Sequence, residues 1–220
     1  MTTSAACSEP RQALVETMRR LAALGLNRGT AGNASVRTAD GFLVTPSGVK
    51  PEALDAAAMV ALAADGRAME PAARPSSEWR FHRDIYAARD DVAAIVHVHS
   101  SHAAALSCLG QGIPAFHYMV ARAGGADIRC APYATFGTQA LSDAAVAALA
   151  ERRACLLANH GQIAVGGSLA EAVDLAVEVE ELAHQYLLAR QGGEPVLLSA
   201  VEMDIVIEKF KHYGARYGEE

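Results

Sequence analysis

The sequence predicts a single α/β domain in which helices cover a mixed or antiparallel β-sheet. The 220 residues are 51% hydrophobic and 20% charged, a balance typical of a globular domain. Strand and helix patterns alternate irregularly, with several hairpin signals, which disfavours a doubly wound parallel sheet. The chain shows no linker, internal repeat or low-complexity tract. If the chain were divided into two domains, each would be too small to bury a sizeable hydrophobic core. We therefore expect one domain.

The first half of the chain is expected to form a helix, two hairpins and a second helix. Ser8 can cap the first helix, in which Leu14 and Leu21 fall on one apolar stripe. The Asp-Gly dipeptides at 40–41 and 65–66 favour tight turns between short β-prone segments. A serine at position 76 or 77 can open the second helix. The expected ranges are 8–24 (helix), 35–37, 42–45 and 59–63 (strands) and 76–88 (helix).

The second half alternates strands with longer helices. Residues 93–98 are apolar and rich in β-branched side chains, which predicts a buried strand. Ser168 with Glu171, and Ser199 with Glu202, have the spacing of capping boxes and mark two helix starts. The expected ranges are 93–98 (strand), 101–109 and 138–152 (helices), 155–159 and 162–165 (strands), 168–190 (helix) and 199–214 (helix).

Bulk properties exclude several function classes. The formal charge of -6 and the pI near 5.7 argue against a nucleic-acid-binding surface. No apolar run approaches the roughly 20 residues of a membrane helix. The segment 1–10 lacks the basic and apolar regions of an export signal. The four cysteines form no Cys-x-x-Cys pair, which favours free thiols and a cytoplasmic protein.

Three histidines have the placement of metal ligands. His97 and His99 lie two residues apart on an expected strand, so their imidazoles point the same way. His160 follows an apolar segment that should emerge into a turn at Gly161. Three imidazoles with one open position are typical of a catalytic zinc site, and manganese or cobalt stays an alternative. An isolated histidine is more often an ordinary core or surface residue, and we interpret His82, His102, His184 and His212 in that way.

Glu78 stands at the start of the second expected helix, where a carboxylate ordinarily just complements the helix dipole. If that helix points at a metal site, Glu78 becomes the natural general acid/base or fourth ligand. Three segments of small residues could bind an anion through backbone N–H groups and hydroxyls, although each alone is only a turn. These segments are Gly32-Asn33, Ser47-Gly48 and Ser76-Ser77.

Taken together, these motifs resemble the class II aldolase/adducin family. The likeness runs from the first helix almost to the C-terminus, and the ordered His-x-His, Ser-Ser-Glu and His-Gly elements are its most specific part. The adducin-type binding domains of the family generally lack the metal histidines, which this chain has. The matching stretches are 25–33, 75–82, 96–99, 113–119, 130–138, 160–161 and 208–214.

The resemblance implies a fold, an assembly and residue roles. It implies that residues 1–220 form one three-layer α/β/α domain around a mostly antiparallel central sheet, and that the protein is a homotetramer with sites between subunits. Tyr118 would reach into a neighbouring subunit's site and handle the proton on the aldehyde oxygen. The implied metal ligands are His97, His99, His160 and Glu78, with Glu78 also the acid/base. The implied phosphate cradle is Gly32, Asn33, Ser47, Gly48, Ser76 and Ser77. The implied wall at the aldehyde end is Phe136, Phe210 and Tyr213.

The implied reaction is cleavage of a ketose 1-phosphate into dihydroxyacetone phosphate and an aldehyde, through a zinc-stabilised enediolate. The first expectation for the substrate is a sugar like L-fuculose 1-phosphate. The alternatives are 5-deoxyribulose 1-phosphate, its 5-methylthio analogue, and the reactions of a 4-epimerase or a dehydratase on the same framework. Asn159, Gln162 and Arg122 depart from the family pattern, which bears on the substrate more than on the reaction type.

A Schiff-base aldolase is disfavoured. The chain has only three lysines, at 50, 209 and 211, and two of them lie in a charged terminal helix. A Schiff-base lysine needs a desolvated or otherwise perturbed site.

Overall fold

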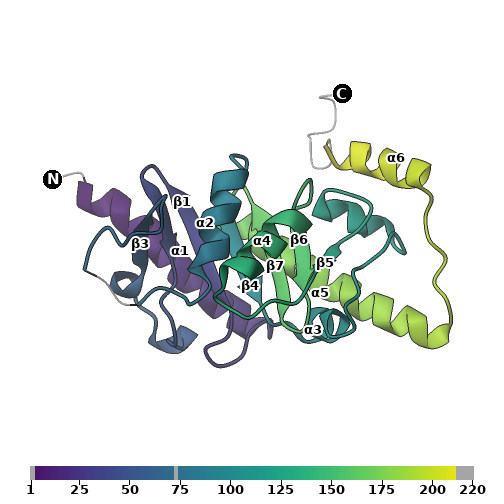
Figure 1. Cartoon of the computed structure of the whole chain (residues 1–220), viewed down its shortest axis with the longest axis horizontal. Helices are drawn as coiled ribbons and strands as arrows, with labels where there is room; N and C mark the ends of the chain where they lie inside the picture. Colours follow the sequence, from purple (N-terminus) through teal and green to yellow (C-terminus); the bar gives the residue numbers. More distant parts are fainter. Residues whose placement is uncertain (1–2, 72–73, 212–220) are drawn as a thin grey trace.

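The central feature of the fold is one seven-stranded sheet. Figure 1 shows the computed structural model, which describes residues 3–71 and 74–211. The strand order is β3-β2-β1-β4-β7-β6-β5, and every neighbouring pair is antiparallel except β5 and β6. The predicted α/β fold with a mostly antiparallel sheet is therefore confirmed. The strands are β1 Asn33–Thr38, β2 Gly41–Val44, β3 Val60–Ala63, β4 Ala94–Val98, β5 Arg129–Ala131, β6 Ala154–Leu157 and β7 Gly161–Gly166.

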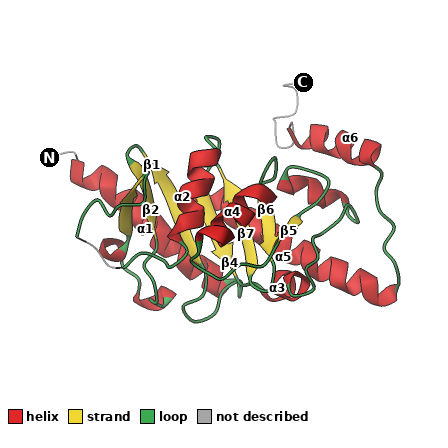
Figure 2. Ribbon diagram, in the orientation of Figure 1, coloured by secondary structure: helices red, strands yellow, loops and turns green. Residues whose placement is uncertain are grey.

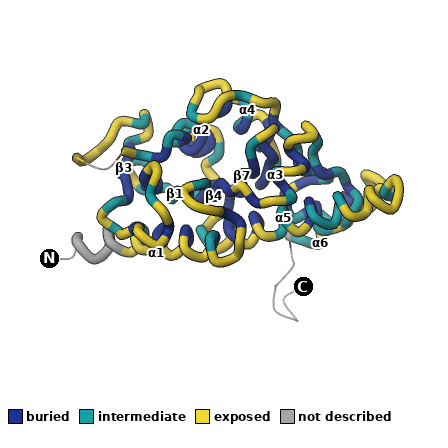
Figure 3. The backbone as a smooth tube through the Cα atoms, turned by 90° about the horizontal axis from the view of Figure 1, so that it is seen from below, coloured by how far each residue is buried: buried dark blue, intermediate teal, exposed yellow. Residues whose placement is uncertain are grey.

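Helices cover both faces of this sheet, which gives three layers (Figures 2 and 3). Helices α2 and α4 pack on one face, and α1, α3 and α5 pack on the other. Helix α6 packs beside the 3-10 helix η3. Within the described ranges, no helix combines the length and the apolar character needed to cross a membrane. The helices are α1 Thr3–Ala23, η1 Pro51–Ala53, η2 Ala56–Ala58, α2 Trp79–Ala88, α3 Ser101–Ser107, η3 Tyr118–Ala123, α4 Gln139–Ala148, α5 Leu169–Gly192 and α6 Ala200–Lys211.

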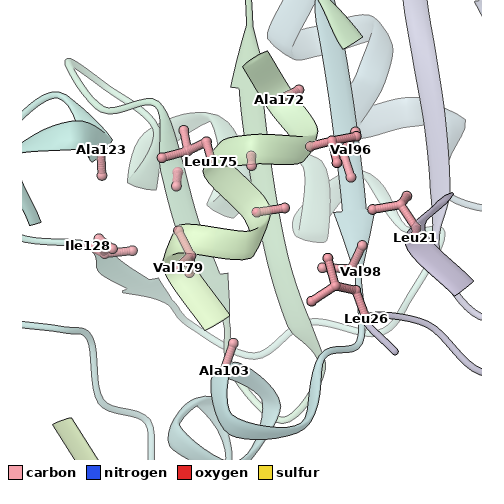
Figure 4. Packing of buried hydrophobic residues seen from close by; sticks show 14 of the residues in the cluster. Leu21, Leu26, Val96, Val98, Ala103, Ala123, Ile128, Ala172, Leu175 and Val179 are labelled. Atoms are coloured by element: carbon pink, nitrogen blue, oxygen red, sulfur yellow. The ribbon is translucent and has the colours of Figure 1, made fainter. Parts of the chain in front are cut away.

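Strand β4 separates the two hydrophobic cores. Val96 and Val98 belong to the core cluster formed with α1 and α5. Figure 4 shows them on the strand beside Leu21 and Leu26, with Leu175 and Val179 on the neighbouring helix. Between these side chains, His97 points to the opposite face, where its ring meets Phe81 of α2 edge-on at 5.5 Å. Burying a side chain such as Leu175 contributes roughly 1.5–3 kcal/mol. The apolar residues of β4 thus anchor the strand, while the alternation of side chains presents His97 to the α2 layer.

Several element boundaries differ from the sequence-based prediction. Helix α2 begins at Trp79, three residues after Ser76, because Glu78 occupies the N-cap position. Helix α4 ends at Ala148, since the chain turns through Glu151 in a left-handed conformation (φ 57°). Strand β5 was not predicted, because its three residues are too few for a visible period. The predicted end of the last helix near Gly214 lies outside the described residues.

The capping box predicted for α6 is complete, whereas at α5 only half of the predicted box forms, because the Glu171 carboxylate accepts from the Gly167 N–H at 3.2 Å rather than from Ser168. The Ser168 hydroxyl accepts a hydrogen bond from the Glu171 N–H at 3.2 Å at the start of α5. The Ser199 N–H donates to the Glu202 carboxylate at 2.7 Å, and the Glu202 N–H donates back to the Ser199 hydroxyl at 3.3 Å. These bonds satisfy N–H groups that the first turn of each helix cannot pair internally.

Candidate metal site and pocket

The three predicted metal-binding histidines come together at the ends of β4 and β7. His97 lies on β4 beside Asn33 of β1, His99 follows the end of β4, and His160 precedes β7. Gly161 allows this approach, because a Cβ atom at that position would stand 2.4 Å from the Val98 carbonyl oxygen. A larger residue there would push the start of β7 away from the end of β4.

Glu78 completes the cluster from the N-terminus of α2. The three imidazole rings have pairwise centroid separations of 4.8 Å. The Glu78 carboxylate lies 3.2 Å from His97 Nε2 and 3.3 Å from His160 Nε2. One potential ligand atom from each of Glu78, His97, His99 and His160 lies within 4.8 Å of all the others. Three imidazole nitrogens and one carboxylate oxygen form a donor set suited to a divalent cation.

The electrostatics of the cluster keep the donors ready to bind a cation. Burial raises the pKa of Glu78, but the charges of His97 and His160 and the hydrogen bonds from His97 and Asn33 outweigh burial and lower it to about 2. Burial, reinforced by neighbouring imidazoles, lowers the pKa values of His99 and His160 to about 4. Among the described groups, no hydrogen-bond donor serves the buried Oε1 atom of Glu78. A buried carboxylate oxygen with no donor is costly, and a bound cation would satisfy it.

A pocket of about 340 Å³ opens next to the cluster. All three predicted anion-binding segments line it, so residues far apart in sequence converge on one cavity. A bridge between Pro46 and Pro75, with the Ser47 N–H donating to the Arg74 carbonyl at 2.9 Å, holds two of these segments side by side. The predicted site residues that line the pocket are Gly32, Asn33, Ser47, Gly48, Ser76, Ser77, Glu78, His99, His160 and Phe136.

Comparison with known proteins identifies the family. The profile of the class II aldolase and adducin N-terminal domain matches residues 12–187. The chain belongs to the class II aldolase and adducin family. A 5-methylthioribulose-1-phosphate/5-deoxyribulose-1-phosphate aldolase of Rhodospirillum rubrum is 55% identical over 93% of this chain and 92% of its own length. The L-fuculose phosphate aldolase of Escherichia coli K12 is 48% identical over 94% of this chain and 96% of its own length. A solved L-fuculose 1-phosphate aldolase superposes with a TM-score of 0.90 at 41% identity, covering 93% of this chain and 97% of that chain.

Within this class II aldolase family, the intact histidines and Glu78 mark the chain as an enzyme with a metal site, a lyase rather than a non-catalytic binding module. Of the three residues expected to depart from the family pattern, Asn159 and Gln162 lie at the site, whereas Arg122 lines a separate groove. Asn159 lines the pocket in a left-handed conformation (φ 56°), which asparagine tolerates well. Gln162 is buried behind His97 and donates to the Ser100 hydroxyl at 2.8 Å, and Arg122 pairs with Glu178 at 2.8 Å.

Some predicted residues of this aldolase do not meet the others within one chain. Tyr118 lies on η3, is 51% exposed, and stacks on Phe210 of α6 with ring centroids 6.5 Å apart. Both line a separate groove of about 850 Å³ rather than the pocket. Tyr213 lies outside the described residues.

The sequence analysis missed the residues that support the site from behind. His82 is fully buried, in line with the core alternative of its ordinary interpretation, but its contact with the site was not predicted: its ring lies 2.6 Å from the Asn33 amide. Asn27, in the loop between α1 and β1, accepts a hydrogen bond from the His99 N–H at 2.9 Å. The four-residue spacing of Glu78, His82 and Tyr86 on one helix face was a signal that could have found the first of these.

Proposed function

We propose that this aldolase cleaves 5-deoxyribulose 1-phosphate and its 5-methylthio analogue into dihydroxyacetone phosphate and a short aldehyde. The observation that carries this choice is the 55% identity to the R. rubrum aldolase named for those two substrates. The first expectation from the sequence, L-fuculose 1-phosphate, becomes the second candidate, since the relatives named for it are 48% identical. All three substrates share the phosphate, the C2 carbonyl and the C3 and C4 hydroxyls, and differ beyond C4.

His97, His99, His160 and Glu78 would hold the metal ion, and zinc suits this donor set best, with manganese or cobalt as alternatives. When bound, the ion supplies a Lewis acid that stabilises negative charge developing on substrate oxygen.

The chain's own groups move the protons. Tyr118 of a neighbouring subunit takes the proton of the C4 hydroxyl as the C3–C4 bond breaks and the aldehyde forms. The electron pair of that bond stays with the C2–C3 fragment. Glu78, ionised in the resting site, takes up one proton from water and delivers it to C3 to give dihydroxyacetone phosphate. Tyr118 releases the proton that it gained to water, so both groups return to their starting states. Glu78 suits this role because its carboxylate is buried at the pocket and its Oε1 atom has no donor among the described residues.

The phosphate would lie in the cradle of small residues. None of the described residues that line the pocket is a lysine or an arginine. Backbone N–H groups and the hydroxyls of Ser47, Ser76 and Ser77 would therefore bind the phosphate. Phosphate binding far from the reacting carbons positions them and lowers the barrier to cleavage.

The decisive experiment measures kcat/KM for the three ketose phosphates, with released dihydroxyacetone phosphate reduced by a coupled NADH-dependent reductase. We expect the two 5-substituted ribulose phosphates to give the higher values. A higher value for L-fuculose 1-phosphate would support the second candidate. An epimerised or dehydrated product without triose phosphate would overturn the aldolase proposal.

We also propose that the enzyme is a homotetramer in which Tyr118, Phe210 and Tyr213 complete a neighbour's site. The half-exposed Tyr118 and its stacking on Phe210, both outside the pocket of their own chain, support this arrangement. Light scattering on the purified protein measures the subunit number, and a monomer would contradict the proposal.

A further inference from the structure

A row of buried polar side chains runs between α2 and β1, behind the metal site. Glu78 is the N-cap residue of α2, and His82 and Tyr86 follow it at intervals of four along one face of the helix. Asn33 and Ser35 lie two apart on β1 and face the same layer. All five are almost completely buried, with exposed fractions from 0 to 6%. Polar groups so deep must satisfy one another, so the contacts between them are strongly constrained.

The contacts form a continuous chain. The Asn33 amide lies 2.9 Å from Glu78 Oε2 on one side and 2.6 Å from His82 Nε2 on the other. The second ring nitrogen of His82 lies 2.7 Å from the Ser35 hydroxyl, which lies 2.8 Å from the Tyr86 hydroxyl.

The direction of each hydrogen bond follows from the chemistry of Glu78. A carboxylate only accepts, so Asn33 must turn its NH2 group toward Glu78 and its carbonyl oxygen toward His82. His82 Nε2 must then carry a hydrogen and donate it. Burial lowers the pKa of His82 to about 3, so the ring is neutral and its Nδ1 accepts from the Ser35 hydroxyl. The hydroxyl of Tyr86 donates to Ser35 in turn.

We infer that His82 is a positioning residue for Glu78, acting through Asn33. By donating to the Asn33 carbonyl oxygen, His82 prevents the amide from rotating and keeps its NH2 group on Glu78 Oε2. This contact fixes the Oε2 atom of the carboxylate. The other oxygen, Oε1, then faces the pocket and the imidazole of His160. The inference deepens the proposed function and rests on it where it assumes that Glu78 carries the proton.

Two substitutions separate positioning from simple core support. The amide nitrogen of glutamine can stand near the place of His Nε2 and donate as it does. The amide group of asparagine reaches only near the place of Nδ1, where its oxygen can accept from Ser35. His82→Gln therefore preserves the donor to Asn33, whereas His82→Asn preserves only the contact with Ser35. We expect His82→Asn to lower kcat by about 10- to 100-fold with a much smaller change in KM, as is found for outer partners of metal-site residues. His82→Gln should keep most of the wild-type kcat, although both variants lower Tm.

Metal content and a control variant complete the test. Zinc per subunit, measured by elemental analysis, should stay stoichiometric in both variants, since all three metal-binding histidines remain. Tyr86→Phe removes the far end of the row but leaves the Ser35 hydroxyl to serve His82, so it should lower Tm and leave kcat unchanged. Equal losses of kcat in His82→Asn and His82→Gln, following the losses in Tm, would reduce His82 to a core residue.

An NMR measurement tests the inference independently of catalysis. The 15N shifts of the His82 ring should show a neutral imidazole protonated on Nε2. A neutral ring protonated on Nδ1 would overturn the proposed direction of the chain. If the wild-type enzyme cleaved no ketose 1-phosphate, the proposed function would fail, but this measurement would still decide how His82 and Asn33 are bonded.

Discussion

The Nε2 atoms of His97 and His99 lie 2.9 Å apart at the centre of the site. The other ring nitrogen of His97 donates to the Gln162 carbonyl at 2.9 Å, which leaves a lone pair on Nε2 when the ring is neutral. The same Nε2 atom lies 3.2 Å from a carboxylate oxygen of Glu78. Lone pairs directed at one another repel unless a proton or a cation lies among them, so this arrangement favours cation binding.

Removing the metal should therefore lower both activity and stability. We expect a chelator to abolish turnover and lower Tm, and added zinc to reverse both effects. Zinc at 100 times its Kd should add about 2.7 kcal/mol to the free energy of unfolding, provided that it binds only the folded state. Differential scanning fluorimetry with increasing zinc measures the effect.

A pair of histidine variants provides the control for this prediction. His99→Ala removes one donor of the cluster and should make Tm much less sensitive to zinc. His184→Ala changes a histidine on α5 that stacks on His102 outside the cluster, and should respond as the wild type does. If excess zinc did not raise the Tm of the wild-type protein, this result would contradict the metal site.

Glu78→Gln should keep the metal and lose most of the turnover. The amide preserves the shape of the side chain but cannot carry the proton, and general acid–base catalysis is worth roughly 100- to 10,000-fold. Elemental analysis and kcat are the two measurements. Glu52→Gln, an exposed carboxylate on η1, is the matched control and should behave as the wild type. Nearly full activity of Glu78→Gln would show that another group moves the proton.

The sequence predicts those parts of the site in which the local period of the backbone determines the direction of the side chains. A strand alternates its side chains, and this predicted that His97 and His99 share a face; His99 lies one residue beyond the end of β4 and still turns its ring toward His97. The capping boxes of α5 and α6 are likewise local, since they depend on residues three apart. The approach of His97 to His99, the complete box of α6, the serine half of the α5 box and the fold class were confirmed.

The features that the sequence did not predict depend on tertiary partners. Burial of His82 follows from the polar face that β1 presents to α2, and nothing in the helix pattern alone shows what lies opposite. Strand β5 exists because three residues pair in parallel with β6. His160 reaches the other ligands because β7 begins very close to the end of β4. Gly161 permits this close approach, since it has no Cβ atom.

Gly161→Ala should destabilise the enzyme and impair the metal site. A Cβ atom at this position would stand 2.4 Å from the backbone oxygen of Val98, which cannot move without shifting β4. We expect a loss of about 1–3 kcal/mol, typical of overpacking, and weaker zinc binding. Urea denaturation and a competitive zinc titration measure the two effects.

Gly192→Ala is the matched control for Gly161→Ala. A Cβ atom there meets nothing within 4 Å, at the end of α5. Alanine is favoured over glycine in helices by roughly 0.5–1 kcal/mol, so this variant should be neutral or slightly more stable. Equal stability of the two variants would show that β7 can shift to accommodate a methyl group.

Asp84 should make the stability of the α2–α4 contact depend on pH. Burial raises the pKa of this carboxyl, but hydrogen bonds from Arg83, Ser142 and Gln139, the last two at 2.6 Å, outweigh burial and lower it. A lowered pKa means that the stabilisation is present above the ordinary value of about 3.9 and is lost as the pH falls through the folded-state value.

Asp84→Asn should thus cost about 0.5–1.5 kcal/mol at neutral pH, because solvent screens this partly exposed carboxyl, and the difference from the wild type should shrink in acid. Urea denaturation at neutral and acidic pH, at one protein concentration, measures both values. Asp40→Asn in the exposed β1–β2 turn is the control, because Asn-Gly suits the same turn as Asp-Gly. A difference that stays constant with pH would mean that the Asp84 charge contributes nothing.

Mixing two inactive variants should restore activity if Tyr118 acts in a neighbour's site. Glu78→Gln and Tyr118→Phe tetramers should each lose at least about 100-fold in kcat. In a hybrid, some sites combine an intact Glu78 from one subunit with an intact Tyr118 from the next. If the two variants are present in equal amounts and assemble at random into a closed ring, each of the two residues is intact at about half of the sites. About a quarter of all sites therefore have both residues intact. Co-expression with two affinity tags, followed by sequential purification, yields the hybrids for assay.

Pairing Glu78→Gln with His160→Asn is the control. Both residues belong to the pocket of one chain, so every hybrid site lacks one of them and no recovery is expected. If the first hybrid also stayed inactive, Tyr118 would have to act within its own chain or not at all, because only a shared site lets one subunit supply what its neighbour lacks.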